Sequence, residues 1–234
     1  MFSQLQMLLI EIIYFLLIFC CCGIIFYKVR SLYSFSKYKG LKYFGNAFLF
    51  LAIGFLIRFI VMLLKVLQDN NITGTISDFN IFTIGTVFTM VLPGFFFLYS
   101  LLWKSFEKKK YGSSFFAQIP IYIAALIIAL IDYTFKTLNT MYITQISLFF
   151  IISIIIYLKL RTRKYKKNRF MWFFFVSMIL LLVIWIINFI AQYTINTAPL
   201  MRIHTYILTI ITCFVMLYLV TNLMNGIDNK NYGS

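Results

Sequence analysis

Three ionisable side chains, Glu11, Arg58 and Asp132, stand within apolar stretches long enough to cross a membrane. A charged side chain inside a bilayer costs about 2.5–3.5 kcal/mol on insertion scales, so such residues pair, bind a ligand or reach the surface. Arg58 precedes Lys65, at the end of its stretch, by seven residues, about 10 Å along a helix. We expect Arg58 to bind an anion or to pair with Glu11 or Asp132. Alternatively, the two carboxylates reach the headgroups and Arg58 snorkels outward.

Two further polar residues, Asn188 and His204, fall at a similar depth in later apolar stretches. With the three charged residues they predict a polar layer near one face of the membrane, and we treat it as a candidate ligand-binding site. His204 is the single histidine of the chain, and one histidine is too few for a zinc site. We therefore predict neither a metal nor a cofactor.

No motif typical of a catalytic centre accompanies this polar layer. The six acidic residues form no carboxylate pair and no metal-binding motif. The sequence also contains no phosphate-binding glycine loop and no Ser–His–Asp set. We therefore expect no catalytic residues and no enzyme activity.

Seven apolar stretches of roughly 20 residues must position these side chains. A bilayer core about 30 Å thick needs about 20 helical residues, so each stretch predicts a transmembrane helix. Hydrophobic residues make up 62% of the 234 residues, well above the roughly 45–50% of a soluble domain. We expect an all-α polytopic membrane bundle that forms one domain over residues 1–234. The predicted spans are Met7–Tyr27, Tyr43–Leu64, Phe79–Trp103, Phe115–Phe135, Tyr142–Leu160, Phe170–Tyr193 and Leu200–Leu223.

The distribution of basic residues predicts the orientation of the chain. Most of its 21 Lys and Arg residues lie in the first, third and fifth loops, and positively charged loops stay in the cytoplasm. The N-terminus is therefore expected outside and the C-terminus inside, in the cell membrane. The same loops would attract anionic lipids at the cytoplasmic face of the bilayer. A nucleic-acid partner is not expected, because no folded element presents these charges as a groove or platform.

A glycosylation sequon lies in the second loop, where Asn71 begins the tripeptide Asn-Ile-Thr. The charge distribution places this loop outside the cell, where such sequons are modified. The sequence therefore predicts Asn71 as a glycosylation site.

An internal repeat becomes visible when the chain is shifted by 130 residues. The first two spans then align without gaps with the fifth and sixth, so that Asn188 falls on Arg58 and Lys167 falls on Lys37. The aligned spans run in the same direction, which predicts a parallel repeat about an axis along the membrane normal. We expect a 3+1+3 arrangement of repeat 1 (about 1–110), a linker helix (111–138) and repeat 2 (about 139–225).

Two segments, Tyr27–Tyr33 and Lys42–Phe48, resemble small uncharacterised archaeal membrane proteins. The seven spans, the external N-terminus and the short loops also resemble the seven-helix sensor regions that precede histidine kinase domains in archaea and bacteria. This resemblance rests on architecture, covers all seven spans and implies ligand sensing. Only Asn225–Ser234 follows the last span, so the resemblance implies a signal passed to a partner protein.

Three functions remain open from the sequence. A receptor-like or sensor-like module would bind a small or lipidic ligand in an outward pocket lined by Arg58. A small solute transporter would gather polar residues between the two repeats near the midplane. A non-catalytic assembly subunit would neutralise Arg58 with Glu11 or Asp132 and would contain no cavity.

Overall fold

The computed structural model describes residues 4–69, 79–107, 118–162, 169–193 and 198–231 of the chain. These residues form seven α-helices and no strand, which confirms the all-helical prediction. Six of the helices are long and apolar enough to cross a membrane, whereas α4 has 17 residues. The chain is therefore an integral membrane protein. Its helices are α1 (Gln4–Ser36), α2 (Lys39–Asp69), α3 (Phe79–Glu107), α4 (Ile119–Phe135), α5 (Asn139–Arg161), α6 (Arg169–Ala191) and α7 (Ala198–Asn231).

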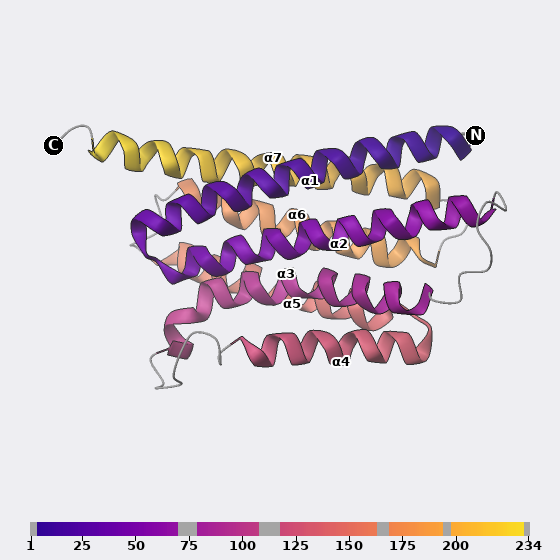
Figure 1. The fold of residues 1–234 in the computed structure, drawn as a ribbon. Helices are drawn as coiled ribbons and strands as arrows, with labels where there is room; N and C mark the ends of the chain where they lie inside the picture. The colour runs from indigo at the N-terminus through magenta and orange to yellow at the C-terminus, as the bar shows by residue number, and fades with distance from the viewer. Residues whose placement is uncertain (1–3, 70–78, 108–117, 163–168, 194–197, 232–234) are drawn as a thin grey trace.

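Six helices are neighbours in a closed order, and we call these six the ring (Figure 1). The order is α1, α2, α3, α5, α6, α7 and back to α1, and α4 contacts only α3 and α5 within the described residues. The N-terminus and the C-terminus lie at opposite ends of the bundle (Figure 1). Following the charge distribution, we name these the outer end and the inner end.

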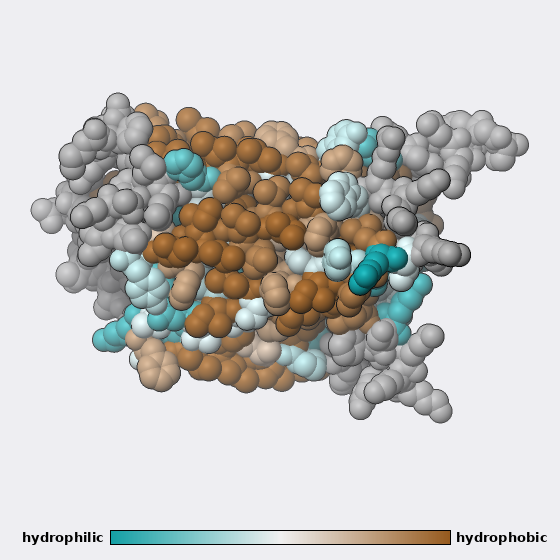
Figure 2. All heavy atoms as spheres, turned by 180° about the vertical axis from the view of Figure 1, so that it is seen from behind, coloured by the Kyte–Doolittle hydropathy of each residue, from teal (hydrophilic) through white to brown (hydrophobic). Residues whose placement is uncertain are grey.

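An apolar belt crosses the middle of the face shown in Figure 2. Hydrophobic side chains cover the centre of the visible face, and more polar residues gather toward its two ends. Among the residues whose burial is described, large exposed hydrophobic side chains come from every helix except α3, which contacts α2, α4 and α5. Such a surface is unfavourable in water and suits the hydrocarbon interior of a bilayer.

Two turns contain a lysine in the left-handed backbone conformation. Lys37 after α1 and Lys136 after α4 both have a φ of 52°. The amide of Lys37 donates to the Tyr33 carbonyl at 2.8 Å, and that of Lys136 donates to the Tyr133 carbonyl at 3.3 Å. These bonds satisfy carbonyls at the helix ends. The turns therefore connect α1 to α2 and α4 to α5 without a long loop.

Pro93 does not divide α3, which runs as one helix from Phe79 to Glu107. The side chain of Gln145 on α5 reaches this region and donates from Nε2 to the Met90 carbonyl at 2.7 Å. Gln145 is fully buried. A polar group from a neighbouring helix thus supports the backbone beside the proline, as is common in membrane helices.

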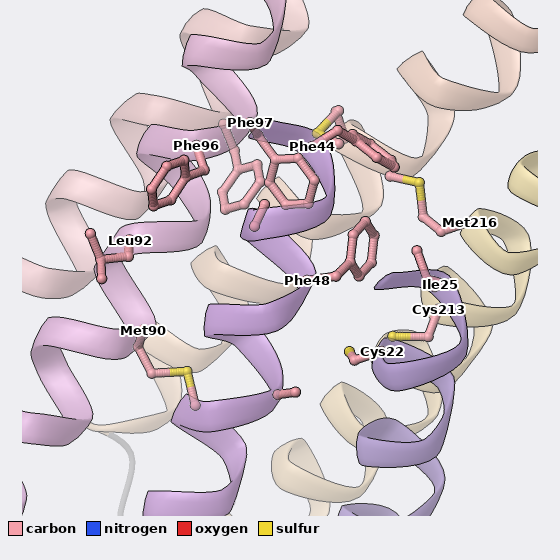
Figure 3. Close-up of a cluster of buried hydrophobic side chains, with 14 of the residues drawn as sticks. Cys22, Ile25, Phe44, Phe48, Met90, Leu92, Phe96, Phe97, Cys213 and Met216 are labelled. Atoms are coloured by element: carbon pink, nitrogen blue, oxygen red, sulfur yellow. The ribbon is translucent and has the colours of Figure 1, made fainter. Parts of the chain in front are cut away.

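Buried side chains from all six ring helices belong to one hydrophobic cluster, and we call one residue from each helix the middle layer. Figure 3 labels the members from α1, α2, α3 and α7. Neighbouring rings in this layer contact closely, with 5.4 Å between the centroids of Phe48 and Phe97 and 6.2 Å between those of Phe97 and Phe149. Lipid is as apolar as these side chains, so van der Waals packing holds the layer together. Its members, each at most 3% exposed, are Ile25, Phe48, Phe97, Phe149, Met178 and Met216.

Candidate functional site

The structure brings Glu11 of α1 and Arg58 of α2 together near the outer end of the ring. Both line a small pocket with Tyr14 of α1 and Tyr206 of α7, and we call these four residues the outer cluster. The Tyr206 hydroxyl donates to Glu11 Oε1 at 2.9 Å. The Tyr14 and Tyr206 rings stack with their centroids 4.1 Å apart. The hydrogen bond and the aromatic pair therefore both join α1 to α7, and Arg58 of α2 lines the same pocket.

Arg58 interacts electrostatically with the side chains of Tyr206, Tyr14 and Tyr142 and, more weakly, with Glu11. Within the described part of the chain, Arg58 makes no ion pair with Glu11. Glu11 instead accepts the hydrogen bond from Tyr206. Arg58 is exposed and lines the pocket.

The pocket beside Arg58 is small, at about 30 Å³. A water molecule needs at least about 10–15 Å³ when space is measured in this way, so the pocket holds about two. In this conformation it has no room for an organic ligand.

Asp132 binds the backbone at the outer end of α5. Its two carboxylate oxygens accept from the backbone amides of Thr140 at 2.9 Å and Met141 at 2.8 Å. These amides belong to the first turn of α5, whose donors have no partner within their own helix. Asp132 is 1% exposed, so this buried carboxylate has hydrogen-bond donors for both of its oxygens.

Two other predicted site residues, Asn188 and His204, do not join the outer cluster. Asn188 donates from Nδ2 to the Ile184 carbonyl of its own helix at 3.0 Å. His204 lies on the exposed side of α7 and does not line the pocket. Asn71, the predicted glycosylation site, lies outside the described residues.

A larger cavity of about 200 Å³ lies at the inner end of the ring, and sequence reasoning missed it. All six ring helices contribute to its wall, and Tyr38 of the turn after α1 joins them. We call this space the inner cavity. Its lining residues are Val29, Leu32, Tyr38, Gly40, Leu41, Phe44, Ser100, Leu101, Lys159, Met171, Phe174, Val220 and Leu223.

Lys159 of α5 is the charged residue in the wall of the inner cavity. Its side chain is half-buried, and Nζ donates to the Leu101 carbonyl at 3.2 Å. The sequence placed this lysine at the end of a span and treated it as one of many cytoplasmic cations. A signal was present, because Lys159 follows the apolar run of α5 directly and precedes the rest of the basic loop.

Comparisons with known proteins assign no function to this architecture. No protein-family model matches the chain, and no solved structure matches it. It is similar to a protein of Archaeoglobus fulgidus described as an uncharacterized protein, with 26% identity over 224 residues. The match covers 92% of this chain and 93% of that protein. It supports the expected resemblance to archaeal membrane proteins, whereas the resemblance to histidine kinase sensor regions has no support from these comparisons.

Proposed function

We propose that this protein is a non-catalytic carrier that moves a small solute along the axis of the six-helix ring. The inner cavity carries this proposal, because every ring helix lines one space of about 200 Å³. Solute sites in membrane carriers lie between helices that change their relative positions. A space bounded by all six helices would change shape whenever any helix of the ring moves.

The outer half of the ring is closed in this conformation. The middle layer packs tightly above the inner cavity, and beyond it the outer cluster leaves only about 30 Å³. In the proposed cycle, this conformation would be the inward-facing state. Opening the outer cluster and closing the inner cavity would give the outward-facing state.

The neighbour order supports the 3+1+3 repeat as part of this proposal. Helices α1, α2 and α3 follow one another in the ring, as α5, α6 and α7 do, and the contact of α3 with α5 has its counterpart in the contact of α7 with α1. A two-fold axis along the membrane normal would relate the two units. Rocking of one unit against the other is a common route to alternating access.

Helix α4 serves as the linker and the seventh span in this proposal. Its 17 residues are at the lower limit for crossing a bilayer. Its outward side presents apolar residues that are 44–52% exposed, namely Ile123, Leu126, Ile127 and Leu130. This face suits lipid, and the basic loops orient the chain with its N-terminus outside the cell membrane.

A receptor-like role at the outer cluster is the second candidate. Arg58 lines that pocket without an ion pair to Glu11, which is the feature expected of an anion-binding side chain. Such a receptor would pass its signal to a partner protein. The small volume beside Arg58 favours the carrier, and the inner cavity argues against an assembly subunit without a cavity.

Thiol accessibility tests the carrier. In a background with the four cysteines replaced by alanine, Ser100→Cys places a reporter in the inner cavity and Met62→Cys places one in the outer pocket. A membrane-impermeant maleimide is applied to either face of sealed vesicles. Leu126→Cys on the lipid-facing side of α4 is the control and should remain unreactive.

The carrier predicts reaction of Ser100→Cys from the inner face and of Met62→Cys from the outer face. It also predicts that bulky modification of Ser100→Cys slows the reaction of Met62→Cys in the double variant at least fivefold. Independent reaction rates at the two positions would contradict alternating access.

A further inference from the structure

The inner cavity combines one cation with an otherwise mostly apolar wall. From this combination we infer that its ligand is a small organic monoanion whose charged group binds Lys159 and whose apolar body packs against the ring helices. This inference rests on the proposed carrier function and specifies its substrate class.

The charge of the wall selects an anion. An ammonium group has three donors, and the Leu101 carbonyl accepts from one of them at 3.2 Å. Two donors remain for a carboxylate or similar group. No acidic side chain lines the cavity among the described residues, so a bound anion would be the counter-ion of Lys159.

A second lysine strengthens this preference. Lys104 of α3 interacts electrostatically with Lys159 and raises the positive potential around it. Lys104 is itself held over the Tyr38 ring, 5.5 Å from the centroid, and Tyr38 lines the cavity. A single negative charge at Lys159 would relieve this like-charge repulsion.

The apolar wall selects the body of the ligand. Val29, Leu32, Phe44, Phe174 and Val220 line the space and are almost completely buried. An apolar cavity of about 150 Å³ admits benzene, so about 200 Å³ accommodates a ring with a small substituent. Inorganic anions would leave this wall without contacts, and a long acyl chain would exceed the volume.

The Trp103 indole provides a reporter beside the cavity. Its Nε1 lies 2.8 Å from where a Cβ on the cavity-lining Gly40 would stand. Replacing Trp172 and Trp185 with phenylalanine leaves Trp103 as the single tryptophan of the full chain. Its fluorescence then reports ligand binding in purified protein in lipid nanodiscs.

The test compares three probes that share a benzene ring, at equal ionic strength: benzoate, benzyl alcohol and benzylammonium. Benzoate should change the Trp103 fluorescence saturably and bind at least tenfold more tightly than the other two. Equal affinity of benzoate and benzyl alcohol would overturn the inference. So would preference for benzylammonium.

Lysine variants locate the anion. Lys159→Met should weaken benzoate binding at least tenfold, whereas Lys159→Arg should keep most of it. Lys28→Met is the matched control, because Lys28 is also a half-buried lysine, bonded at 3.1 Å to Thr221 outside the cavity wall. Equal losses in the Lys28 and Lys159 variants would overturn the site.

A steric variant keeps the inference testable if Lys159→Met fails to fold. Val220→Phe fills the cavity, retains Lys159 and should also abolish benzoate binding. Retention of binding in this variant would contradict the site.

The two experiments distinguish the carrier from the site. If benzoate binding requires Lys159 but the two thiol reaction rates are independent, the carrier is refuted and the site is kept. Coupled thiol rates without benzoate binding would refute the substrate class and keep the carrier.

Discussion

Gly94 of α3 lies directly against the side-chain amide of Gln145 on α5. A Cβ atom on Gly94 would stand 2.7 Å from Gln145 Oε1 and 3.0 Å from Leu148 Cδ1. Beside this contact, Gln145 Nε2 donates to the Met90 carbonyl at 2.7 Å. Small residues commonly allow such close approaches between membrane helices. The glycine therefore sets the distance between α3 and α5, where the group α1, α2, α3 meets the group α5, α6, α7.

Replacing Gly94 with alanine should destabilise the protein by about 1–3 kcal/mol, because the new methyl group overlaps a buried amide. Thermal unfolding in detergent measures the change. Gly85→Ala on the same helix is the control, since its nearest neighbour is the Ile57 Cδ1 atom at 3.8 Å. That variant should be neutral or slightly stabilising. Equal unfolding temperatures for the two variants would contradict the close packing of α3 on α5.

Loss of the Asp132 carboxylate should destabilise α5. Asp132→Ala leaves two first-turn amides without their acceptors and should cost about 0.5–2 kcal/mol. Asp132→Asn keeps one acceptor and should cost less. Both variants should bind benzoate normally, as measured by Trp103 fluorescence, because Asp132 does not line the inner cavity. Weakened benzoate binding would instead assign Asp132 a role in ligand recognition.

Cys22 of α1 and Cys213 of α7 lie side by side at the seam that closes the ring (Figure 3). Both thiols are free and buried. With Cys20 and Cys21 replaced by alanine, oxidation with copper phenanthroline should join Cys22 to Cys213, and mass spectrometry should detect the linked peptide. The matched control variant keeps Cys20 in place of Cys22. Cys20 is exposed and should not form a link to Cys213. Absence of the Cys22–Cys213 link would place α1 and α7 farther apart than described here.

Arg58→Leu should leave the unfolding temperature unchanged or higher. The guanidinium makes no ion pair with Glu11, and a cation at this depth costs about 2.5–3.5 kcal/mol on insertion scales. The same change should remove the coupling between the two reporter thiols, since Arg58 lines the outer pocket that must open. A large drop in the unfolding temperature would show that Arg58 has a structural role. It would also favour the assembly subunit.

The apolar stretches predicted the positions of the helices because bilayer thickness sets a minimum length for each span. The fifth predicted span, Tyr142–Leu160, compares with Asn139–Arg161 in the structure. The first helix extends to Ser36, beyond the predicted Tyr27, because a helix continues past the membrane until a turn residue such as Lys37 ends it.

The inner cavity could not be predicted, because apolar residues cover every side of these helices. Without a polar face, the sequence does not show which side of a helix faces the ring. Lys159 therefore looked like an ordinary loop cation. Asp132 was equally ambiguous, since its partners at Thr140 and Met141 become close only through the tight turn at Lys136. Glu11 and Arg58 line one pocket but do not form the ion pair that the sequence offered as an alternative to anion binding.

Two spin-label distances test solute movement through the ring most directly. One label pair replaces Tyr27 and Tyr157 at the inner end, and the other replaces Ile60 and Ile190 at the outer end; all four side chains are exposed. Each pair joins positions that the proposed two-fold axis relates. Adding benzoate should redistribute each pair between two distances, with opposite shifts at the two ends. If benzoate binds in the Trp103 fluorescence assay, a single distance within each pair that benzoate leaves unchanged would contradict a carrier.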